Sequence, residues 1–592
     1  MSTPNNRRQD PGGFSGEVLL LSVLVGVVIA LLFIVNISVR LGHKFSGSEG
    51  TLTSDPFELV FTTFQGKVEW PTTATFIAIA LCVVLLAIVV LILLMARKFR
   101  KNSTRVDRAA QYMGRGRDIE SLTTKKAQES ADRFGVESPG LPIGSTLTGV
   151  SLYSSWEDMR ISIAGPRMGK STCQVIPQII AAPGAVLNTS NKRDTTDATR
   201  DIRAKFGKVW VFDPQGIANE EPTWWWNPLS YVSDEVTAAK LAEHFASGSR
   251  DPNAKTDAYF DPAGQDLLAG LLLAAALDQR PITDVYTWIT RPKDETAVFI
   301  LQDHQFNMIA DQVMGVIQAP DKQRGGIYGT AQQMASCLTI RRVASWVNPQ
   351  SMADARPQFS PHEFVRGKNT LYSLSKEGRG TAGPLVTALT VAVAEAAEEL
   401  ATSKGGRLSV PLVGILDEAA NVCRWRELPN LYSHYGSRGI IFDTVLQSWS
   451  QGVGVWGESG MKMLWSAANV KFYGGNVSEK AFLDDMAAFI GDFDRVTSSV
   501  SSGRGQRSVS RQLHRERILG VDDLAALPKG RGVVFSAGNR PVLIRTKPWM
   551  TGPMAEDIKA SITAHDPQSK ETLDNAQEGI LEVARLEESS AK

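Results

Sequence analysis

Two long apolar runs lie near the N-terminus of the chain, whereas the later hydrophobic residues come in short clusters. Residues 18–39 and 74–95 each comprise 22 residues without a charged side chain. At 1.5 Å per residue, a helix of this length crosses a hydrocarbon core of roughly 30 Å. The first run exceeds a signal-peptide core in length, and no small-residue cleavage site follows it. We therefore predict two transmembrane helices.

The basic residues around these runs predict their orientation. Six follow the second run: Arg97, Lys98, Arg100, Lys101, Arg105 and Arg108. The intervening loop, residues 40–73, carries three lysines and arginines among four acids. Because basic segments stay on the cytoplasmic side of a cell membrane, we expect loop 40–73 to face outward. The N-terminal tail 1–17 and the large C-terminal part would both be cytoplasmic.

Short apolar runs bounded by turn residues begin at about residue 144. Six of them are typical of buried strands: residues 159–165, 184–190, 208–213, 369–375, 411–417 and 439–447. Helical patterns separate several of these runs. Short buried strands that alternate with helices indicate a mostly parallel sheet. The fold class predicted for this part of the chain is therefore α/β.

One interval breaks the alternation of strands and helices. Residues 233–360 have a helical pattern throughout, most clearly at 263–279, and predict an all-α domain inserted into the sheet domain. The insertion would divide the sheet domain into residues 144–232 and 361–550. Residues 96–143 are interpreted as a basic linker with a pair of helices. Residues 551–592 are interpreted as an acidic tail, solvated from about residue 566.

Composition limits the remaining possibilities. The net charge of +1 gives no global attraction to nucleic acid, so any DNA contact must come from a local patch. The four cysteines and seven histidines are scattered, which argues against a disulfide framework or a zinc site. Residues 498–517 form one such basic patch, interpreted as a solvated hairpin or loop or as a flexible arm that contacts DNA phosphates. Its arginines are Arg504, Arg507, Arg511, Arg515 and Arg517.

A glycine loop follows the strand at 159–164 and precedes a helical pattern. In this context the backbone N–H groups of the loop surround phosphates, and the helix N-terminus adds partial positive charge. Lys170 would reach the β- and γ-phosphates of ATP, and the Ser171 hydroxyl would bind Mg²⁺. Ala164 replaces the first glycine of the usual pattern, but Gly165 follows directly; the alternative is a turn that binds nothing. The predicted nucleotide-binding residues are Ala164, Gly165, Pro166, Arg167, Met168, Gly169, Lys170, Ser171 and Thr172.

Three further positions are candidates for ATP hydrolysis. The strand at 413–416 ends in Asp417 and Glu418, which are predicted to hold Mg²⁺ and to polarise the attacking water; the alternative is a helix cap. Gln447, at the end of the next strand, is a candidate sensor of the γ-phosphate or an ordinary capping amide. Arg438 precedes that strand and is a candidate arginine finger across a subunit boundary, or an ordinary surface arginine.

The order of these motifs resembles the coupling proteins of type IV secretion systems. The glycine loop at residues 164–172, a Walker A motif, is followed by a series of further motifs. In order, these are GAVLNTSNKRD, GKVWVFDPQG, WWWNPLSYV, YFDPAGQDLLAGLLLAAA, LDEAANV, VLQSWSQ and RERILGVDDLAALPKGRGVVFSAGNRPVLI. Local variants resemble the actinobacterial branch of the family. Ser190, Asn191 and Lys192 stand where the family commonly has an acidic residue. Trp224, Trp225 and Trp226 favour packing over DNA stacking.

The resemblance implies a hexameric RecA-like P-loop NTPase with an inserted all-α domain on a stem of two transmembrane helices. Its implied cofactors are ATP and Mg²⁺. Its implied partners are DNA bound without sequence preference, a relaxase, and the components of the secretion channel. The implied function is ATP hydrolysis that drives or licenses DNA transfer in conjugation. A substrate receptor that does not pump DNA, or a DNA translocase of the cell-division type, is the alternative.

Overall fold

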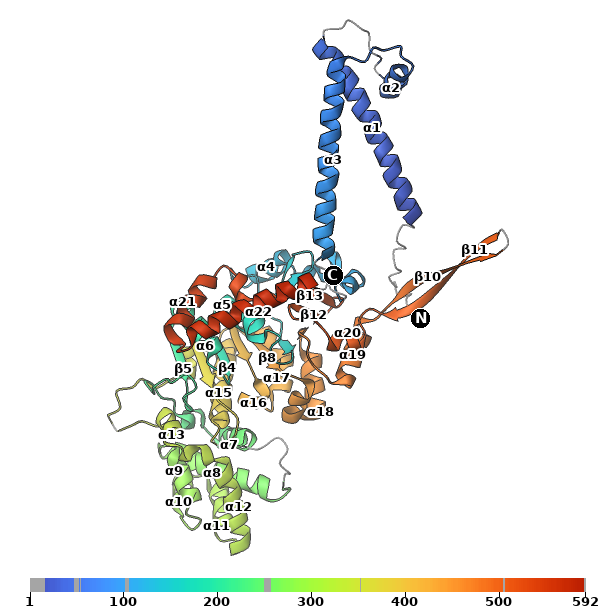
Figure 1. Cartoon of the computed structure of the whole chain (residues 1–592). Helices are drawn as coiled ribbons and strands as arrows, with labels where there is room; N and C mark the ends of the chain where they lie inside the picture. Colours follow the sequence, from blue (N-terminus) through green and yellow to red (C-terminus); the bar gives the residue numbers. More distant parts are fainter. Residues whose placement is uncertain are drawn as a thin grey trace. The chain divides into compact units, whose positions relative to one another are not determined.

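The computed structural model describes residues 16–46, 53, 55–101, 106–249, 257–351, 353–378, 380–503 and 506–589 (Figure 1). The chain forms two compact units. One unit comprises residues 1–108, 491–518 and 584–592, and the other comprises residues 109–490 and 519–583.

The two apolar runs form the long helices α1 (Gly16–Ser46) and α3 (Thr72–Lys101), with the short helix α2 (Pro56–Phe64) between them. The helices α1 and α3 approach closely at Gly42, where an added Cβ would lie 2.6 Å from the Cβ of Ala74. Large apolar side chains of α3 are exposed, including Phe76 and Leu86. Exposed apolar surface of this extent is characteristic of a lipid environment. The apolar N-terminal helices therefore fit membrane anchoring.

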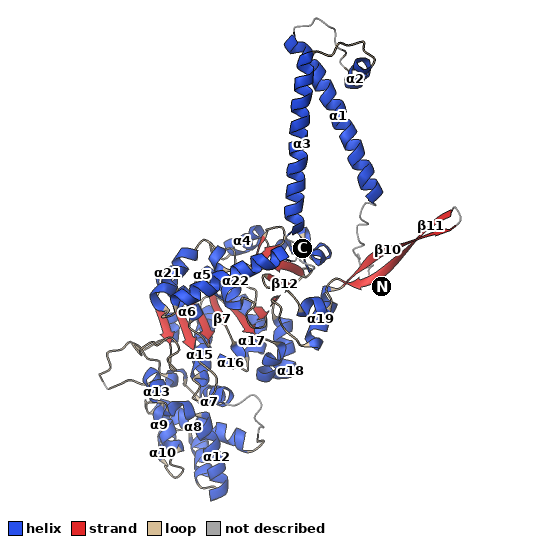
Figure 2. Ribbon diagram, viewed as in Figure 1, coloured by secondary structure: helices blue, strands red, loops and turns tan. Residues whose placement is uncertain are grey.

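An 11-stranded sheet forms the centre of the second unit. Its order is β2-β1-β13-β12-β9-β3-β8-β7-β4-β6-β5, and the strands from β9 to β5 run parallel. All six predicted strands are present, as β3 to β8 (strands in red in Figure 2). The strands are β1 (Leu141–Thr146), β2 (Ser151–Ser154), β3 (Arg160–Ile163), β4 (Val186–Ser190), β5 (Val209–Phe212), β6 (Thr370–Leu374), β7 (Leu412–Leu416), β8 (Ile440–Leu446), β9 (Val470–Tyr473), β12 (Arg531–Ser536) and β13 (Val542–Arg545).

Helices connect the parallel strands, as the α/β pattern predicts. The buried side chains of β4, β7 and β8 pack against the helix after β3 through Val175 and Ile179. These connecting helices are η3 (Ser171–Val175), α5 (Ile176–Ala181), α6 (Asp194–Ala204), α15 (Gly383–Ser403), α16 (Ala419–Val422), α17 (Leu428–Tyr435) and α18 (Trp449–Ala467). Two further helices, α19 (Lys480–Ile490) and α20 (Val521–Ala525), lie between β9 and the antiparallel strand β12.

The interval between β5 and β6 is helical, and its principal helices form the predicted all-α domain. Its central helix α8 is as apolar as a membrane span, but half of that span is buried within the protein. At Gly270 an added Cβ would lie 2.6 Å from Val313 on α11, so these helices pack closely. Helix α8 is therefore a core helix. The helices are α7 (Glu235–Ser249), α8 (Phe260–Leu277), α9 (Thr283–Ile289), α10 (Thr296–Asp303), α11 (Asn307–Ile317), α12 (Asp321–Met334), α13 (Arg341–Val347) and α14 (Pro361–Phe364).

The triple tryptophan is a packing feature, as predicted. Trp224 and Trp226 are buried. The Trp224 ring packs edge-on against Trp210 and Trp346, with ring centroids 5.1 and 5.4 Å apart. These contacts fasten the chain after β5 to the all-α domain, and the two buried rings cannot stack on DNA bases.

One prediction for the flanking segments is wrong. In place of a helix pair, the linker forms the 3₁₀ segments η1 (Val106–Tyr112) and η2 (Gly116–Leu122) and the helix α4 (Thr124–Asp132). Buried apolar residues, Ile119 among them, fasten it to the sheet. The acidic tail forms α21 (Ala555–His565) and α22 (Ser569–Ser589), and Ile558 and Ile562 of α21 pack on α6. The predicted solvated segment from residue 566 is mostly α22, and no residue of α22 whose exposure the structure describes is buried.

The basic segment forms a two-stranded antiparallel hairpin, β10 (Asp492–Gly503) and β11 (Gln506–Arg517). At its base, Arg515 pairs with Asp492 at 2.5 Å. Arg504 lies outside the described residues. The predicted hairpin is therefore present, and its contact with DNA stays a prediction.

Candidate nucleotide-binding site

The predicted phosphate loop lies at the carboxyl end of β3, between β9 and β8 in the sheet. Arg167 has φ +63° and Gly169 has φ +83°, so the loop turns through the left-handed region twice. A helical turn begins directly after it at Ser171. Strand, loop and helix therefore stand in the order that phosphate binding requires.

A second loop, residues 474–476 after β9, packs against the phosphate loop and hydrogen-bonds to it. The Gly165 N–H donates to the Gly475 carbonyl at 2.9 Å, and the Asn476 side chain donates to the Pro166 carbonyl at 3.1 Å. A Cβ at position 165 would overlap the Asn476 carbonyl oxygen. The close approach explains why glycine is required at 165.

The same loop explains the alanine at the first position of the motif. A Cβ placed on Gly474 would lie 2.7 Å from the Cβ of Ala164. The side chain of Ala164 therefore occupies space that Gly474 leaves open. Loop 474–476 was missed in the sequence because YGGN gives only a turn signal.

Lys170 lies folded against its own loop. Its Nζ donates to the carbonyls of Ala164 and Gly165 at 2.8 and 3.3 Å. Burial lowers the pKa of Lys170, while the charges of Glu418 and Asp417 act in the opposite direction. A phosphate group offers this lysine a stronger acceptor than the two carbonyls.

The carboxylates of Asp417 and Glu418 follow β7 at the same sheet edge. Asp417 Oδ1 is buried and has no hydrogen-bond partner among the described residues. Burial, together with the charges of Asp194 and Glu418, raises the pKa of Asp417 to about 8. A buried acceptor without a partner fits a cation, which would satisfy the oxygen and hold the carboxylate ionised.

Asp194, at the start of α6, was missed in the sequence. Burial raises its pKa, and Lys192 lowers it by its charge. No group of three or more metal-ligating side chains occurs among the described residues. A Mg²⁺ ion commonly binds only one or two carboxylates together with phosphate oxygens and water. The residues present therefore fit a nucleotide-bound Mg²⁺ held by Asp417 and Ser171.

Gln447 joins the cluster through Glu418. Its amide nitrogen donates to both carboxylate oxygens of Glu418, at 2.7 and 2.8 Å. Glu418 has a left-handed backbone with φ +54°. The Asn421 side chain donates to the same carboxylate at 3.2 Å. Gln447 therefore fixes the orientation of the acid that is the candidate for activating water.

Arg438 does not join this cluster within the chain. It precedes β8, whereas Gln447 follows it, and the seven residues of β8 separate them by about 23 Å. Its guanidinium pairs with Glu398 on α15. A role for Arg438 as an arginine finger for a neighbouring subunit stays a prediction.

A buried network holds the helix that follows the phosphate loop. Arg160 Nη2 donates to Gln174 Oε1 at 2.9 Å, and Gln178 donates to Asp443 at 2.8 Å. Arg160 and Asp443 also form an ion pair at 3.4 Å, and both side chains are nearly inaccessible. Ser162 donates to Asp443 at 2.9 Å. The network fixes η3 and α5 against the sheet.

The strand with the phosphate loop, β3, is separated from the strand with the acid pair, β7, by the strand with the polar sensor, β8. This arrangement defines a RecA-like P-loop NTPase domain, which carries an inserted all-α domain and apolar N-terminal helices. Residues 411–529 match the family described as "TraM recognition site of TraD and TraG". The match, together with this fold, confirms the resemblance to the type IV secretion coupling protein family.

A solved structure has a similar fold at a TM-score of 0.50, and two others match at lower scores. The bacterial conjugative coupling protein TrwBdeltaN70, in its unbound form, shares 16% identity over 72% of this chain and 91% of its own, with a TM-score of 0.50. The plasmid coupling protein TrwB in complex with ADP and Mg²⁺ shares 17% identity over 68% and 89%, with a TM-score of 0.48. VirB4 of Thermoanaerobacter pseudethanolicus shares 11% over 69% and 96%, with a TM-score of 0.42. No curated protein matches the sequence.

Proposed function

We propose that this protein is a membrane-anchored ATPase that couples a relaxase–DNA complex to a type IV secretion channel in conjugation. One observation carries the proposal. One cluster forms at the ends of the neighbouring strands β3, β8 and β7 of a coupling-protein fold. It comprises Lys170, Asp417, Glu418 and Gln447. In this assignment Lys170 holds the β- and γ-phosphates, Asp417 and Ser171 hold Mg²⁺, and Glu418 orients the attacking water.

The same proposal includes the cellular arrangement. The chain crosses the cell membrane twice, at 18–39 and 74–95, with both termini in the cytoplasm. The nucleotide-binding domain comprises 144–232 and 361–550, and the all-α domain comprises 233–360. Six copies form a ring around DNA. The ring binds the charged phosphates of the DNA backbone and does not read the base sequence. The match at 411–529 supports an accessory or relaxase partner on that segment.

ATP hydrolysis by the full-length protein in detergent tests the enzymatic part. Lys170→Ala should abolish hydrolysis because the phosphates lose their cation. Glu418→Gln should retain ATP binding and lose turnover by a factor of about 10² or more. Glu427→Gln is the matched control, because Glu427 is an exposed acid outside the cluster. Full turnover in Glu418→Gln would move water activation to another residue.

DNA-stimulated hydrolysis separates a motor from a receptor. A motor should hydrolyse ATP faster when single- or double-stranded DNA is added, and Lys170→Ala should abolish DNA transfer between cells. A receptor would transfer DNA with Lys170→Ala or show a rate independent of DNA. The intact acid pair favours the motor.

A further inference from the structure

A second cavity lies away from the nucleotide site. It has a volume of about 530 Å³ and is bounded by η2 and α4, by the turn between β2 and β3, by the start of β9 and by the end of β12. The strands β3 and β9 begin at this cavity, whereas the phosphate loop follows the end of β3. The cavity is therefore separate from the nucleotide site. Its size lies in the range of small-molecule sites.

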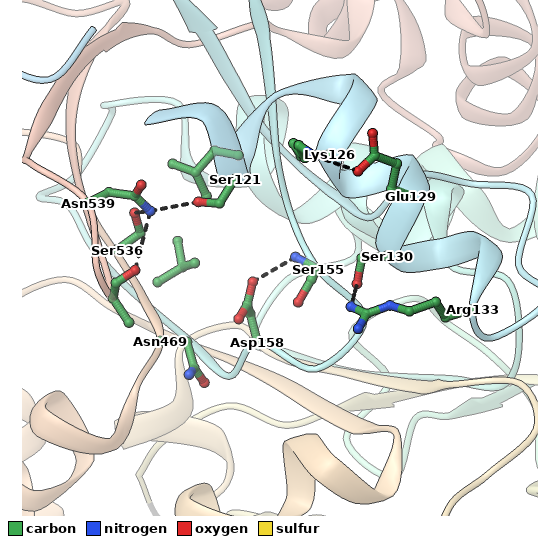
Figure 3. Close-up of a pocket in the computed structure, with 13 residues that line it drawn as sticks. Ser121, Lys126, Glu129, Ser130, Arg133, Ser155, Asp158, Asn469, Ser536 and Asn539 are labelled. Carbon is green, nitrogen blue, oxygen red and sulfur yellow. Dashed lines mark hydrogen bonds and ion pairs between the residues drawn. The ribbon is translucent and has the colours of Figure 1, made fainter. Parts of the chain in front are cut away.

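Most of the residues that line the cavity are polar. Two of them, Arg133 and Asp158, carry opposite charges and do not pair with each other. Figure 3 shows Arg133, directly after α4, and Asp158 of the β2–β3 turn directed into the same space. Arg133 donates to the Ser130 hydroxyl at 3.0 Å, and the backbone N–H of Ser155 donates to Asp158 Oδ2 at 2.7 Å. Among the described residues, neither side chain forms an ion pair. The remaining charges of the lining, Lys126 and Glu129, pair with each other at 2.7 Å.

The side opposite α4 offers amides and hydroxyls. The Asn539 amide donates to the Ser121 hydroxyl at 2.8 Å and to the Ser536 hydroxyl at 2.9 Å. Asn469, whose Oδ1 accepts from the Met159 N–H at 3.0 Å, also lines the cavity (Figure 3). These neutral groups line the cavity without adding net charge.

We propose that this cavity binds a small zwitterion, with its anionic group on Arg133 and its ammonium group on Asp158. The four charged groups of the lining sum to zero, so the cavity does not favour a simple anion or a simple cation. A dipolar ligand pairs the separated cation and anion at once, and each charge-assisted bond is stronger than a neutral one. An amino acid has this chemistry, and so does the phosphoethanolamine headgroup of a phospholipid.

Titration calorimetry on the full-length protein in detergent tests the proposal with O-phosphoethanolamine and with glycine. We expect saturable binding of at least one probe with Kd at or below about 1 mM. Arg133→Gln and Asp158→Asn should each weaken binding about ten-fold or more, because each removes a charge-assisted bond. Lys125→Gln and Asp132→Asn are matched controls on α4, since neither lines the cavity, and both should bind as the parent does.

The source of the zwitterion is resolved by a competition experiment. Protein in nanodiscs of phosphatidylglycerol alone is compared with protein in nanodiscs that include phosphatidylethanolamine. Loss of probe binding in the second membrane assigns the cavity to a lipid headgroup, and unchanged binding assigns it to a free zwitterion. ATP affinity of each variant serves as the folding control. No saturable binding of either probe by the parent, or parental affinity in both properly folded cavity variants, overturns the proposal.

Discussion

Removal of the Asp443 carboxylate tests the buried network under the phosphate loop. In Asp443→Ala the Arg160 guanidinium keeps its hydrogen bonds to the Leu141 and Pro142 carbonyls but is deprived of its only carboxylate partner among the described residues. Burial already lowers the pKa of Arg160, and Asp443 opposes that shift by its charge. The substitution therefore leaves a buried cation without its paired carboxylate, so that only the more distant charge of Asp158 still opposes the shift, and it leaves the Gln178 amide without its acceptor.

The magnitude follows from burial. Removing one partner of a buried ion pair costs about 3–5 kcal/mol. With about 2–4 °C per kcal/mol for a domain of this size, the midpoint of thermal unfolding should fall by roughly 6–20 °C. ATP affinity should fall as well, because η3 and α5 are no longer held against the sheet. Asp557→Asn breaks the exposed pair of Lys205 and Asp557 at 2.8 Å and should cost less than about 1 kcal/mol.

Tryptophan fluorescence during heating, with and without ATP and Mg²⁺, measures both effects. Equal midpoints for Asp443→Ala and Asp557→Asn would refute the reasoning, because a buried cation without a partner cannot be as stable as a solvated one. A large loss of stability with unchanged ATP affinity would show that the network supports the sheet but not the phosphate loop.

Three other predictions concern separate parts of the chain. Gly165→Ala should weaken ATP binding by a factor of about 10 or more, because the new Cβ overlaps the Asn476 carbonyl. Equilibrium binding of a fluorescent ATP analogue measures the affinity, and an affinity equal to that of the parent protein would contradict the close packing. A reporter fused near Gly50 should be extracellular and one at the C-terminus cytoplasmic; the opposite labelling pattern would exclude an ATPase that uses cytoplasmic ATP. Replacing Arg504, Arg507 and Arg511 with Ser should weaken binding to all DNA sequences alike and lower the salt slope by about 0.7 to 0.9 for each phosphate that the hairpin no longer neutralises. An unchanged slope would make the hairpin a surface feature, and ATP affinity should stay constant.

The parallel half of the sheet could be predicted because each strand carries its own signal. Residues 412–416 are an uninterrupted run without a polar side chain, and residues 185–187 are a shorter one at the start of the buried strand β4, as doubly covered strands require. The positions of the phosphate loop and of the acid pair could also be predicted, because the chemistry fixes the spacing of the residues within each motif. Gln447 was placed at a strand end by pattern alone, and the structure adds that it holds Glu418.

The remaining features depend on interactions between distant segments. The antiparallel half pairs β1 with β13, and neither short strand has a strong pattern of its own. Asp194 lies near Asp417 only because β4 and β7 are neighbours. The helix α21 could not be predicted from the acidic composition of residues 551–592, because its apolar residues Ile558 and Ile562 pack on α6, a distant segment.

The position of β3 between β8 and β9 also determines when the phosphate loop can be completed during biosynthesis. Ser162 and its partner Asp443 are 281 residues apart in the chain. At roughly 5–20 residues per second, a ribosome needs about 14–56 s to make the second after the first. During that time the phosphate loop has left the ribosome without either flanking strand, and the apolar N-terminal helices have emerged earlier still. In the proposed arrangement, membrane insertion therefore begins before the candidate nucleotide site can form.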